Sequence, residues 1–123
     1  MGRTGMALRI YHNPRCSKSR QTLEIIRGAG IEPEIVLYLQ DAPSAAVIAE
    51  LAQKLGRPVA DLLRRGEDEF RNAEDLPDLA DDAALATWLA AHPKVIERPI
   101  VVDVESGQAV LGRPPENVNG LLN

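Results

Sequence analysis

The sequence of 123 residues contains a single cysteine, Cys16, and only 3% aromatic residues. One cysteine excludes an internal disulfide framework and is typical of a protein in a reducing compartment. No stretch approaches the roughly 18 apolar residues that a membrane-spanning helix needs, and residues 1–6 lack the apolar segment of a signal peptide. We therefore expect a cytoplasmic protein that has no membrane partner.

The composition also argues against several classes of ligand. The 14 Lys and Arg stand against 18 Asp and Glu, and the net charge of −4 does not favour binding to nucleic acid. The two histidines, His12 and His92, make no convincing metal site with one cysteine, and the sequence has no glycine-rich phosphate loop. We expect no metal site and no bound cofactor.

Cys16 lies where the pattern of the chain changes from strand to helix. Leu8 and Ile10 alternate with polar residues as in a strand, whereas Leu23 and Ile26 recur at helical spacing. The first N–H groups of a helix have no internal partner and carry the positive end of its dipole, so they favour a thiolate over a thiol. Positively charged or titratable side chains surround the same turn: His12, Arg15, Lys18 and Arg20. The pattern predicts an activated cysteine.

The rest of the chain predicts further strands and helices. An apolar run at residues 34–39 completes a strand–helix–strand unit, whose two strands should be parallel. Residues 100–104 and 108–111 predict the two strands of an antiparallel hairpin. Helical segments are expected at residues 44–56, from Pro58 to Arg65, from Asp81 or Asp82 to His92, and at residues 116–122.

Together these elements predict an α/β fold of the thioredoxin-like type, a sandwich with a four-stranded mixed sheet and a helical insertion. The length predicts a single domain over residues 7–123. Residues 1–6 are interpreted as an N-terminal extension, either native or added by cloning. In this architecture the N-terminal end of the first helix, where Cys16 lies, carries the chemistry.

Four blocks of the sequence carry a resemblance to a known family. They are His-Asn-Pro-Arg-Cys-Ser-Lys-Ser-Arg at 12–20, Leu-Leu-Arg at 62–64, Glu-Arg-Pro-Ile-Val-Val at 97–102 and Gly-Arg-Pro at 112–114. Their residues, order and spacing resemble the glutaredoxin-like arsenate reductase family over nearly the whole chain. The Cys-Ser-Lys-Ser segment is closer to the arsenate-reductase-like branch of that family than to its best-characterised reductases, and the chain lacks the longer C-terminal tail of some members.

The resemblance implies a role for each matching residue. Cys16 would be the nucleophile, and His12 would tune the charge near it. Pro99 would be a cis-proline that places Arg98 beside the cysteine. Arg65 offers the same chemistry as its neighbour, but the alignment of the preceding leucines favours Arg64. The resemblance therefore implies three arginines that bind the oxyanion substrate: Arg64, Arg98 and Arg113.

The implied reaction needs such a site. Thiolate attack on arsenate brings two negative charges together, and arginines offset their repulsion with charge-assisted hydrogen bonds. Cys16, once bound to arsenic, needs a second thiol. Ser19, a structural residue near the site, occupies the position at which dithiol relatives have cysteine. The resolving thiol must therefore come from another molecule. The family implies glutathione as co-substrate, followed by glutaredoxin as protein partner.

Two other functions stay open at this point. One is a glutathione-dependent thiol oxidoreductase that uses Cys16 against a different substrate, which Lys18 and the match to the arsenate-reductase-like branch support. The other is a redox regulator that binds RNA polymerase without turnover. Such regulators usually carry a Cys-x-x-Cys pair, and Ser19 argues against one here.

Structural roles are the alternative for the individual residues. Cys16 would then be a small buried apolar side chain, and His12 would only complete its turn by a hydrogen bond. Arg98 and Arg113, each followed by proline at a strand boundary, would be ordinary surface arginines.

Overall fold

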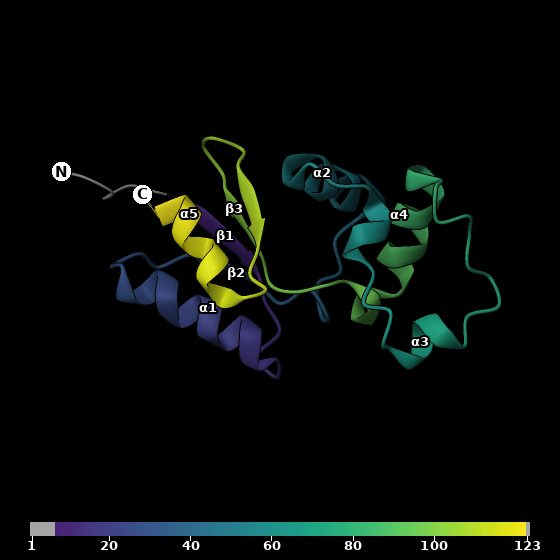
Figure 1. The fold of residues 1–123 in the computed structure, drawn as a ribbon, viewed down its shortest axis with the longest axis horizontal. Helices are drawn as coiled ribbons and strands as arrows, with labels where there is room; N and C mark the ends of the chain where they lie inside the picture. The colour runs from purple at the N-terminus through teal and green to yellow at the C-terminus, as the bar shows by residue number, and fades with distance from the viewer. Residues whose placement is uncertain (1–6, 123) are drawn as a thin grey trace. The chain divides into compact units, whose positions relative to one another are not determined.

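The computed structural model describes residues 7–122, so the N-terminal extension expected at residues 1–6 lies outside the described residues. The chain forms two compact units (Figure 1). The first combines the N-terminal part up to Leu37 with the C-terminal part from Arg98, and the second is Tyr38–Glu97. None of the described helices is both long and apolar enough to span a membrane.

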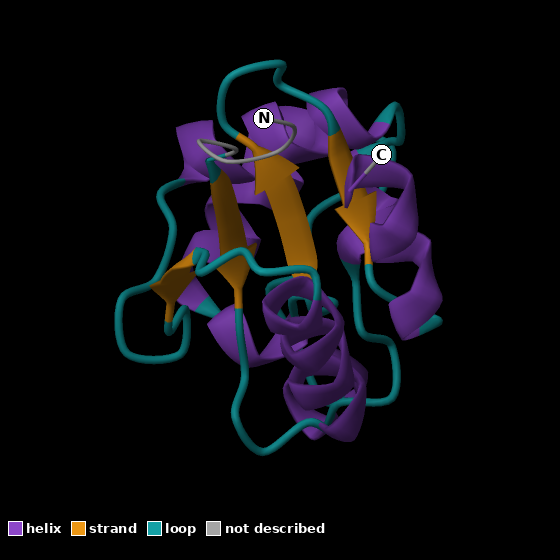
Figure 2. Ribbon diagram, turned by 90° about the vertical axis from the view of Figure 1, so that its left-hand side faces the viewer, coloured by secondary structure: helices purple, strands orange, loops and turns teal. Residues whose placement is uncertain are grey.

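The first unit contains a four-stranded sheet, visible as arrows in Figure 2. Its order is β2-β1-β3-β4; β1 is parallel to β2, and β3 is antiparallel to both β1 and β4. The predicted parallel pair and C-terminal hairpin are therefore confirmed. The strands are β1 (Leu8–Tyr11), β2 (Glu34–Val36), β3 (Ile100–Asp103) and β4 (Ala109–Leu111).

The second strand is shorter than the run at residues 34–39 predicted. Tyr11, the last residue of β1, pairs with Val36, so the residues after Val36 have no partner in the ladder. Residues 38–40 form a turn instead. An apolar run alone does not show where the neighbouring strand ends.

The helices of the first unit share a core with the sheet. Helix α1 (Ser17–Gly28) ends at the predicted glycine, and Gly30 then takes a left-handed φ of +83°. The predicted helix at residues 116–122 is divided into a 3₁₀ turn, η3 (Pro115–Val118), and the short helix α5 (Asn119–Leu122). The shared core consists of Leu8, Ile10, Leu23, Ile26, Ile31, Val101, Val118 and Leu121.

The second unit is helical, and its main helices are capped as the sequence predicts. Helix α2 (Ala45–Leu55) begins after Ser44, whose Oγ accepts the Val47 N–H, and it ends at Gly56 with a φ of +69°. Helix α4 (Asp82–Ala91) begins after Asp81, whose carboxylate accepts the Ala84 N–H. Both helices therefore start and stop at the predicted residues.

The segment from Pro58 to Arg65 is less helical than predicted. Only η1 (Val59–Leu62) forms a 3₁₀ turn, because Leu63 is extended and pairs with Ile96, just after η2 (Pro93–Val95). This pairing is formed by residues distant in sequence, which local periodicity does not reveal. The short helix α3 (Asp68–Arg71) was also not predicted.

Candidate functional site

Cys16 is the N-cap residue of α1, as its position in the sequence predicts. Its backbone is extended (φ −94°, ψ 123°), its N–H donates to the Asn13 carbonyl at 3.0 Å, and its own carbonyl accepts the Arg20 N–H at 3.0 Å. The thiol makes no capping hydrogen bond of ordinary geometry. It is free and half-buried at the start of the helix, where a negative charge is favoured.

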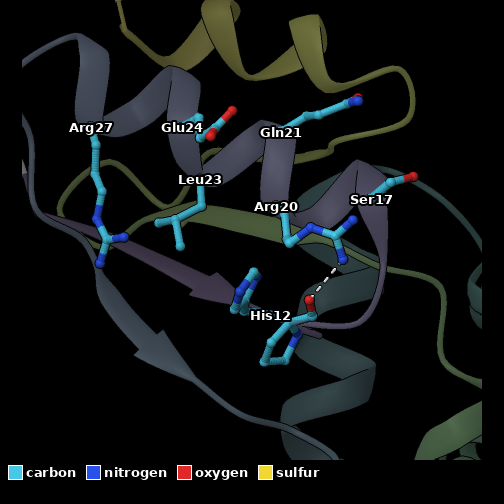
Figure 3. Close-up of a pocket in the computed structure, with 8 residues that line it drawn as sticks. His12, Ser17, Arg20, Gln21, Leu23, Glu24 and Arg27 are labelled. Atoms are coloured by element: carbon cyan, nitrogen blue, oxygen red, sulfur yellow. Dashed lines mark hydrogen bonds between the residues drawn. The ribbon is translucent and has the colours of Figure 1, made fainter.

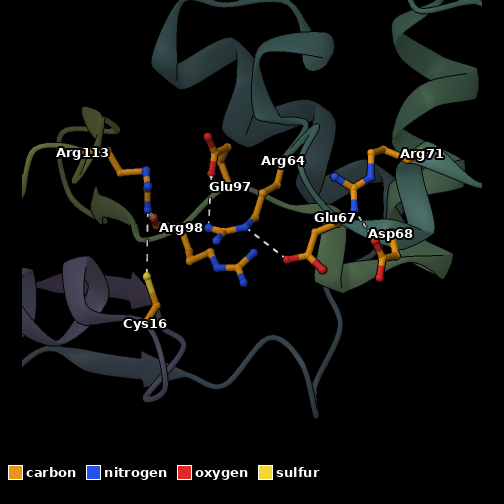
Figure 4. Close-up of polar contacts among 8 residues, drawn as sticks. All are labelled: Cys16, Arg64, Glu67, Asp68, Arg71, Glu97, Arg98 and Arg113. Atoms are coloured by element: carbon orange, nitrogen blue, oxygen red, sulfur yellow. Dashed lines mark hydrogen bonds and ion pairs between the residues drawn. The ribbon is translucent and has the colours of Figure 1, made fainter.

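The surroundings of the thiol stabilise its anionic form. Burial by itself raises the pKa of Cys16, but the nearby backbone N–H groups of Ser19 and Lys18 lower it. The positive charges of Arg98 and Arg113 lower it further, and the net pKa lies below the ordinary cysteine value. Nη1 of Arg113 lies 3.9 Å from Sγ (Figure 4). Cys16 is thus not an inert buried residue.

Arg98 precedes the C-terminal hairpin and Arg113 follows it, and because Ile100 pairs with Leu111, both arginines lie at the open end of the hairpin, near the thiol. Arg98 is only 6% exposed and precedes Pro99 in a cis peptide bond, which the resemblance had implied. Arg113 is half-buried, and its Nη1 also donates to the Arg98 carbonyl at 3.3 Å. Asn117 fixes the backbone of Arg113 by donating from Nδ2 to its carbonyl at 3.3 Å. These two arginines are therefore not ordinary surface side chains.

Gly112 is a residue of this site that sequence reasoning missed. Its N–H donates to the Pro99 carbonyl at 2.8 Å. A Cβ at this position would stand 2.6 Å from Oγ1 of Thr22 and 2.8 Å from Cγ of Pro99, so only glycine fits without a shift. The close approach brings the following residue, Arg113, toward the start of α1. The sequence feature that could have indicated this role is the glycine of the Gly-Arg-Pro block at residues 112–114.

His12 and Ser19 link the loop before Cys16 to the first turn of α1. Both are buried, and Nδ1 of His12 lies 2.6 Å from Oγ of Ser19. The same oxygen accepts the Asn13 N–H at 3.0 Å, while Oδ1 of Asn13 accepts the Arg15 N–H. Asn13 was not singled out from the sequence, although an Asn-Pro pair is a turn signal.

The pKa of His12 argues against a permanent positive charge there. Burial lowers this pKa most, and the charges of Arg27 and Arg20 lower it further. The imidazole is therefore mainly neutral near pH 7. It can still act on Cys16 through the Ser19 contact, so its role in tuning the charge stays a prediction.

Arg64 belongs to the second unit, where two carboxylates hold it. Its Nε lies 3.1 Å from Oε2 of Glu67, and its Nη1 lies 4.0 Å from Oε1 of Glu97 (Figure 4). The neighbouring Arg65 is exposed and lies 5.8 Å from the centre of the Phe70 ring. The two arginines therefore differ in environment, and anion binding by Arg64 stays a prediction.

The first unit thus gathers most of the predicted site residues around one turn. Cys16, Arg98 and Arg113 form the charged part, Pro99 packs beside Gly112, and Ser19 supports the loop. No group of at least three His, Cys, Asp or Glu side chains within residues 7–122 is arranged to hold a metal ion. The arrangement can hold an anionic sulfur beside cationic donors for an oxyanion.

Comparison with known proteins identifies relatives along the whole chain. The model of the ArsC family matches residues 11–121. A protein of Escherichia coli K12, named uncharacterized protein YfgD, is 44% identical over 90% of this chain and 92% of its own length. A protein of Haemophilus influenzae named arsenate reductase is 41% identical over 95% of this chain and 100% of its own.

A solved structure agrees with this result. The arsenate reductase from Vibrio cholerae is 43% identical and superimposes with a TM-score of 0.83, covering 95% of this chain and 98% of its own. Identity and fold therefore agree over almost the full length of both proteins. The chain belongs to the ArsC family and has its thioredoxin-like α/β fold.

Proposed function

We propose that this protein reduces arsenate to arsenite with Cys16 as the nucleophile. The observation that carries the proposal is the Cys16 thiol itself, whose pKa is lowered and whose Sγ lies 3.9 Å from Arg113. The relatives named arsenate reductase support the choice of substrate, since they are about 40% identical over most of the chain. Arg98, Arg113 and Arg64 would bind the arsenate oxygens.

The first step forms a bond between sulfur and arsenic. The Cys16 thiolate attacks arsenic, and one arsenate oxygen takes up protons and leaves as water. Arg98 and Arg113 favour this step because they offset the repulsion between the thiolate and the arsenate oxygens. Arsenic is still pentavalent after this exchange, so the reduction requires further thiols.

External thiols complete the reaction in this proposal. The thiol of glutathione replaces a second oxygen on arsenic, which also leaves as water. A glutaredoxin thiolate then attacks the glutathione sulfur, forms a mixed disulfide and leaves the electron pair of the broken sulfur–arsenic bond on arsenic. Hydrolysis of the remaining bond to Cys16 releases arsenite.

Because Cys16 is the only cysteine, the chain contains no thiol that can replace these partners. We place the reaction in the cytoplasm, where such thiols are kept reduced.

A coupled assay with arsenate, glutathione and glutaredoxin tests the proposal. We expect no turnover in Cys16→Ser and a raised KM for arsenate in Arg98→Ala. Arg71→Ala is the matched control, because Arg71 is an exposed arginine paired with Asp68 in the second unit. Steady turnover with thioredoxin alone would contradict the proposed partners. Consumption of glutathione without arsenate would favour the oxidoreductase with another substrate.

A further inference from the structure

A pocket of about 420 Å³ lies beside α1 in the first unit (Figure 3). Its size falls within the range of small-molecule sites. Cys16, Arg98 and Arg113 do not line it, so it is not the cavity in which the thiol meets the arginines. Its N-terminal end reaches Ser17, the residue that follows Cys16. The pocket is thus distinct from the anion site and adjacent to it in sequence.

Two arginines of α1 line this pocket. Arg20 and Arg27 are seven residues apart, which places them on the same face of the helix at about 10.5 Å along its axis. Arg20 donates from Nη1 to the Pro14 carbonyl, and Arg27 donates from Nε and Nη2 to Glu32. These bonds leave Nη2 of Arg20 and Nη1 of Arg27 for a ligand. Both guanidinium groups can therefore bind carboxylates.

His12 adds a third donor between the two arginines. The residue is only 6% exposed, and Figure 3 shows its ring between Arg20 and Arg27. The hydroxyl oxygen of Ser19, which accepts the Asn13 N–H, lies 2.6 Å from Nδ1 of His12, and in one tautomer of the ring the serine proton is donated to Nδ1. The neutral imidazole then carries its own proton on Nε2. That N–H is available to an anion in the pocket.

The remaining lining residues restrict the ligand further. Pro14 and Leu23 supply apolar surface, Gln21 supplies an amide, and Glu24 supplies one carboxylate. The charged lining is thus two cations and one anion. Its complement is a small molecule with two carboxylates, one ammonium group and amide bonds between them.

We propose that this pocket binds glutathione, whose identity as co-substrate rests on the proposed function. A tripeptide of this kind spans about 10 Å when extended, which matches the spacing of the two arginines. Its γ-glutamyl end lies between Glu24 and Arg27, and its glycine carboxylate lies at Arg20. The cysteinyl residue, which is the middle one of the three, then lies between Arg20 and Arg27.

Binding can be measured without any reaction. S-methylglutathione has no free thiol, and its binding to the wild-type protein is followed through the NMR signals of the His12 ring. We expect saturable shifts, and an increase in Kd of about fivefold or more in Arg27→Gln, which loses a charge-assisted bond. Glu32→Gln is the matched control, because it breaks the same ion pair but keeps Arg27, and it should bind the peptide at least as well as the wild type.

Three results would overturn the inference. They are an absence of His12 shifts with S-methylglutathione, shifts with inorganic phosphate only, and equal weakening in Arg27→Gln and Glu32→Gln. In the arsenate assay, Arg27→Gln should raise the KM for glutathione and leave the KM for arsenate unchanged. A protein that binds S-methylglutathione in the expected pattern but does not reduce arsenate would refute the proposed function and leave the pocket assignment standing.

Discussion

The two units differ in the kind of side chain that they bury. In the described part of the chain, the buried polar or charged side chains other than the aromatic Tyr and Trp belong to the first unit: His12, Asn13, Ser19, Thr22 and Arg98. The buried side chains of the second unit are apolar or aromatic, and its ion pairs are at least partly exposed. Burying a polar group costs free energy unless it is hydrogen-bonded. The buried part of the first unit therefore contains polar groups of the candidate site, whereas the buried part of the second unit is organised by packing.

The strongest test of this difference removes the nucleophile. Cys16→Ser loses the thiolate but keeps a residue that suits a helix N-cap, so the fold should persist. We expect the arsenate reductase rate to fall more than about a thousandfold with little change in Tm. The coupled assay and thermal unfolding measure the two effects. A variant that retains a substantial part of the rate would show that another group attacks the substrate.

A substitution in the core of the second unit should lower the stability of the protein and leave the Cys16 thiol unchanged. Leu85 is fully buried on α4, and Leu85→Ala should lower the free energy of unfolding by about 2–5 kcal/mol. Urea unfolding measures this loss. The pH dependence of Cys16 alkylation should stay that of the wild type under conditions in which the variant is folded. A shifted alkylation profile would mean that the second unit also sets the state of the thiol.

Gly112 tests whether packing in the first unit is also part of the site. Gly112→Ala forces Thr22 and Pro99 apart, and we expect a loss of about 1–3 kcal/mol in the free energy of unfolding. The KM for arsenate should rise as well, because the adjacent Arg113 moves. Gly28→Ala is the control, since a Cβ at Gly28 meets nothing within 4 Å. Equal effects in both variants would contradict the role of the close approach.

Removing the charge of Arg113 should change the thiol without changing the fold. Arg113 lowers the pKa of Cys16, so Arg113→Gln should raise that pKa and move the rise of the alkylation rate to higher pH. At a pH below the ordinary cysteine value, the variant should therefore react more slowly than the wild type. Arg71→Gln is the control and should alkylate as the wild type does. If the pH dependence of alkylation is unchanged in Arg113→Gln, the backbone N–H groups and Arg98 are the cause of the lowered pKa.

The smallest expected effect concerns His12 and the stability of the fold. The pKa of His12 is lower in the folded protein than in the unfolded chain, so the unfolded chain takes up a proton more readily. Stability should therefore fall as the pH drops from the unfolded value, about 6.5, toward the folded one. Urea unfolding at several pH values measures this slope. His12→Gln should have a smaller slope than the wild type, and an equal slope would assign it to other groups.

Local patterns in the sequence predicted the parts of the fold that depend on neighbouring residues. Ser44, Gly56 and Asp81 mark helix ends because capping and left-handed turns are local requirements. Cys16 was recognised for the same reason, since a strand-to-helix turn lies within one short segment. The end of β2 and the extended Leu63 were not predicted, because each depends on a pairing partner distant in sequence.

The sequence predicted those site residues whose side chains have a recognisable chemistry of their own. The arginines carry a recognisable chemistry, whereas Gly112 acts only by leaving room for Thr22 and Pro99. The buried state of His12 also requires the structure, because its neighbours Arg20 and Arg27 approach it from the helix. Contacts across the fold therefore decide the charge of His12.

The position of Cys16 as N-cap has a consequence for the helix that follows it. Helices usually have Ser, Thr, Asp or Asn at this position, whose side chains accept the N–H groups of the first turn. Here the sulfur lies near the N–H groups of Ser19 and Lys18, so any group that becomes attached to the sulfur also alters the start of α1. We expect these two amides to exchange hydrogen faster when Cys16 is alkylated, so that each round of sulfur chemistry loosens and restores the first turn.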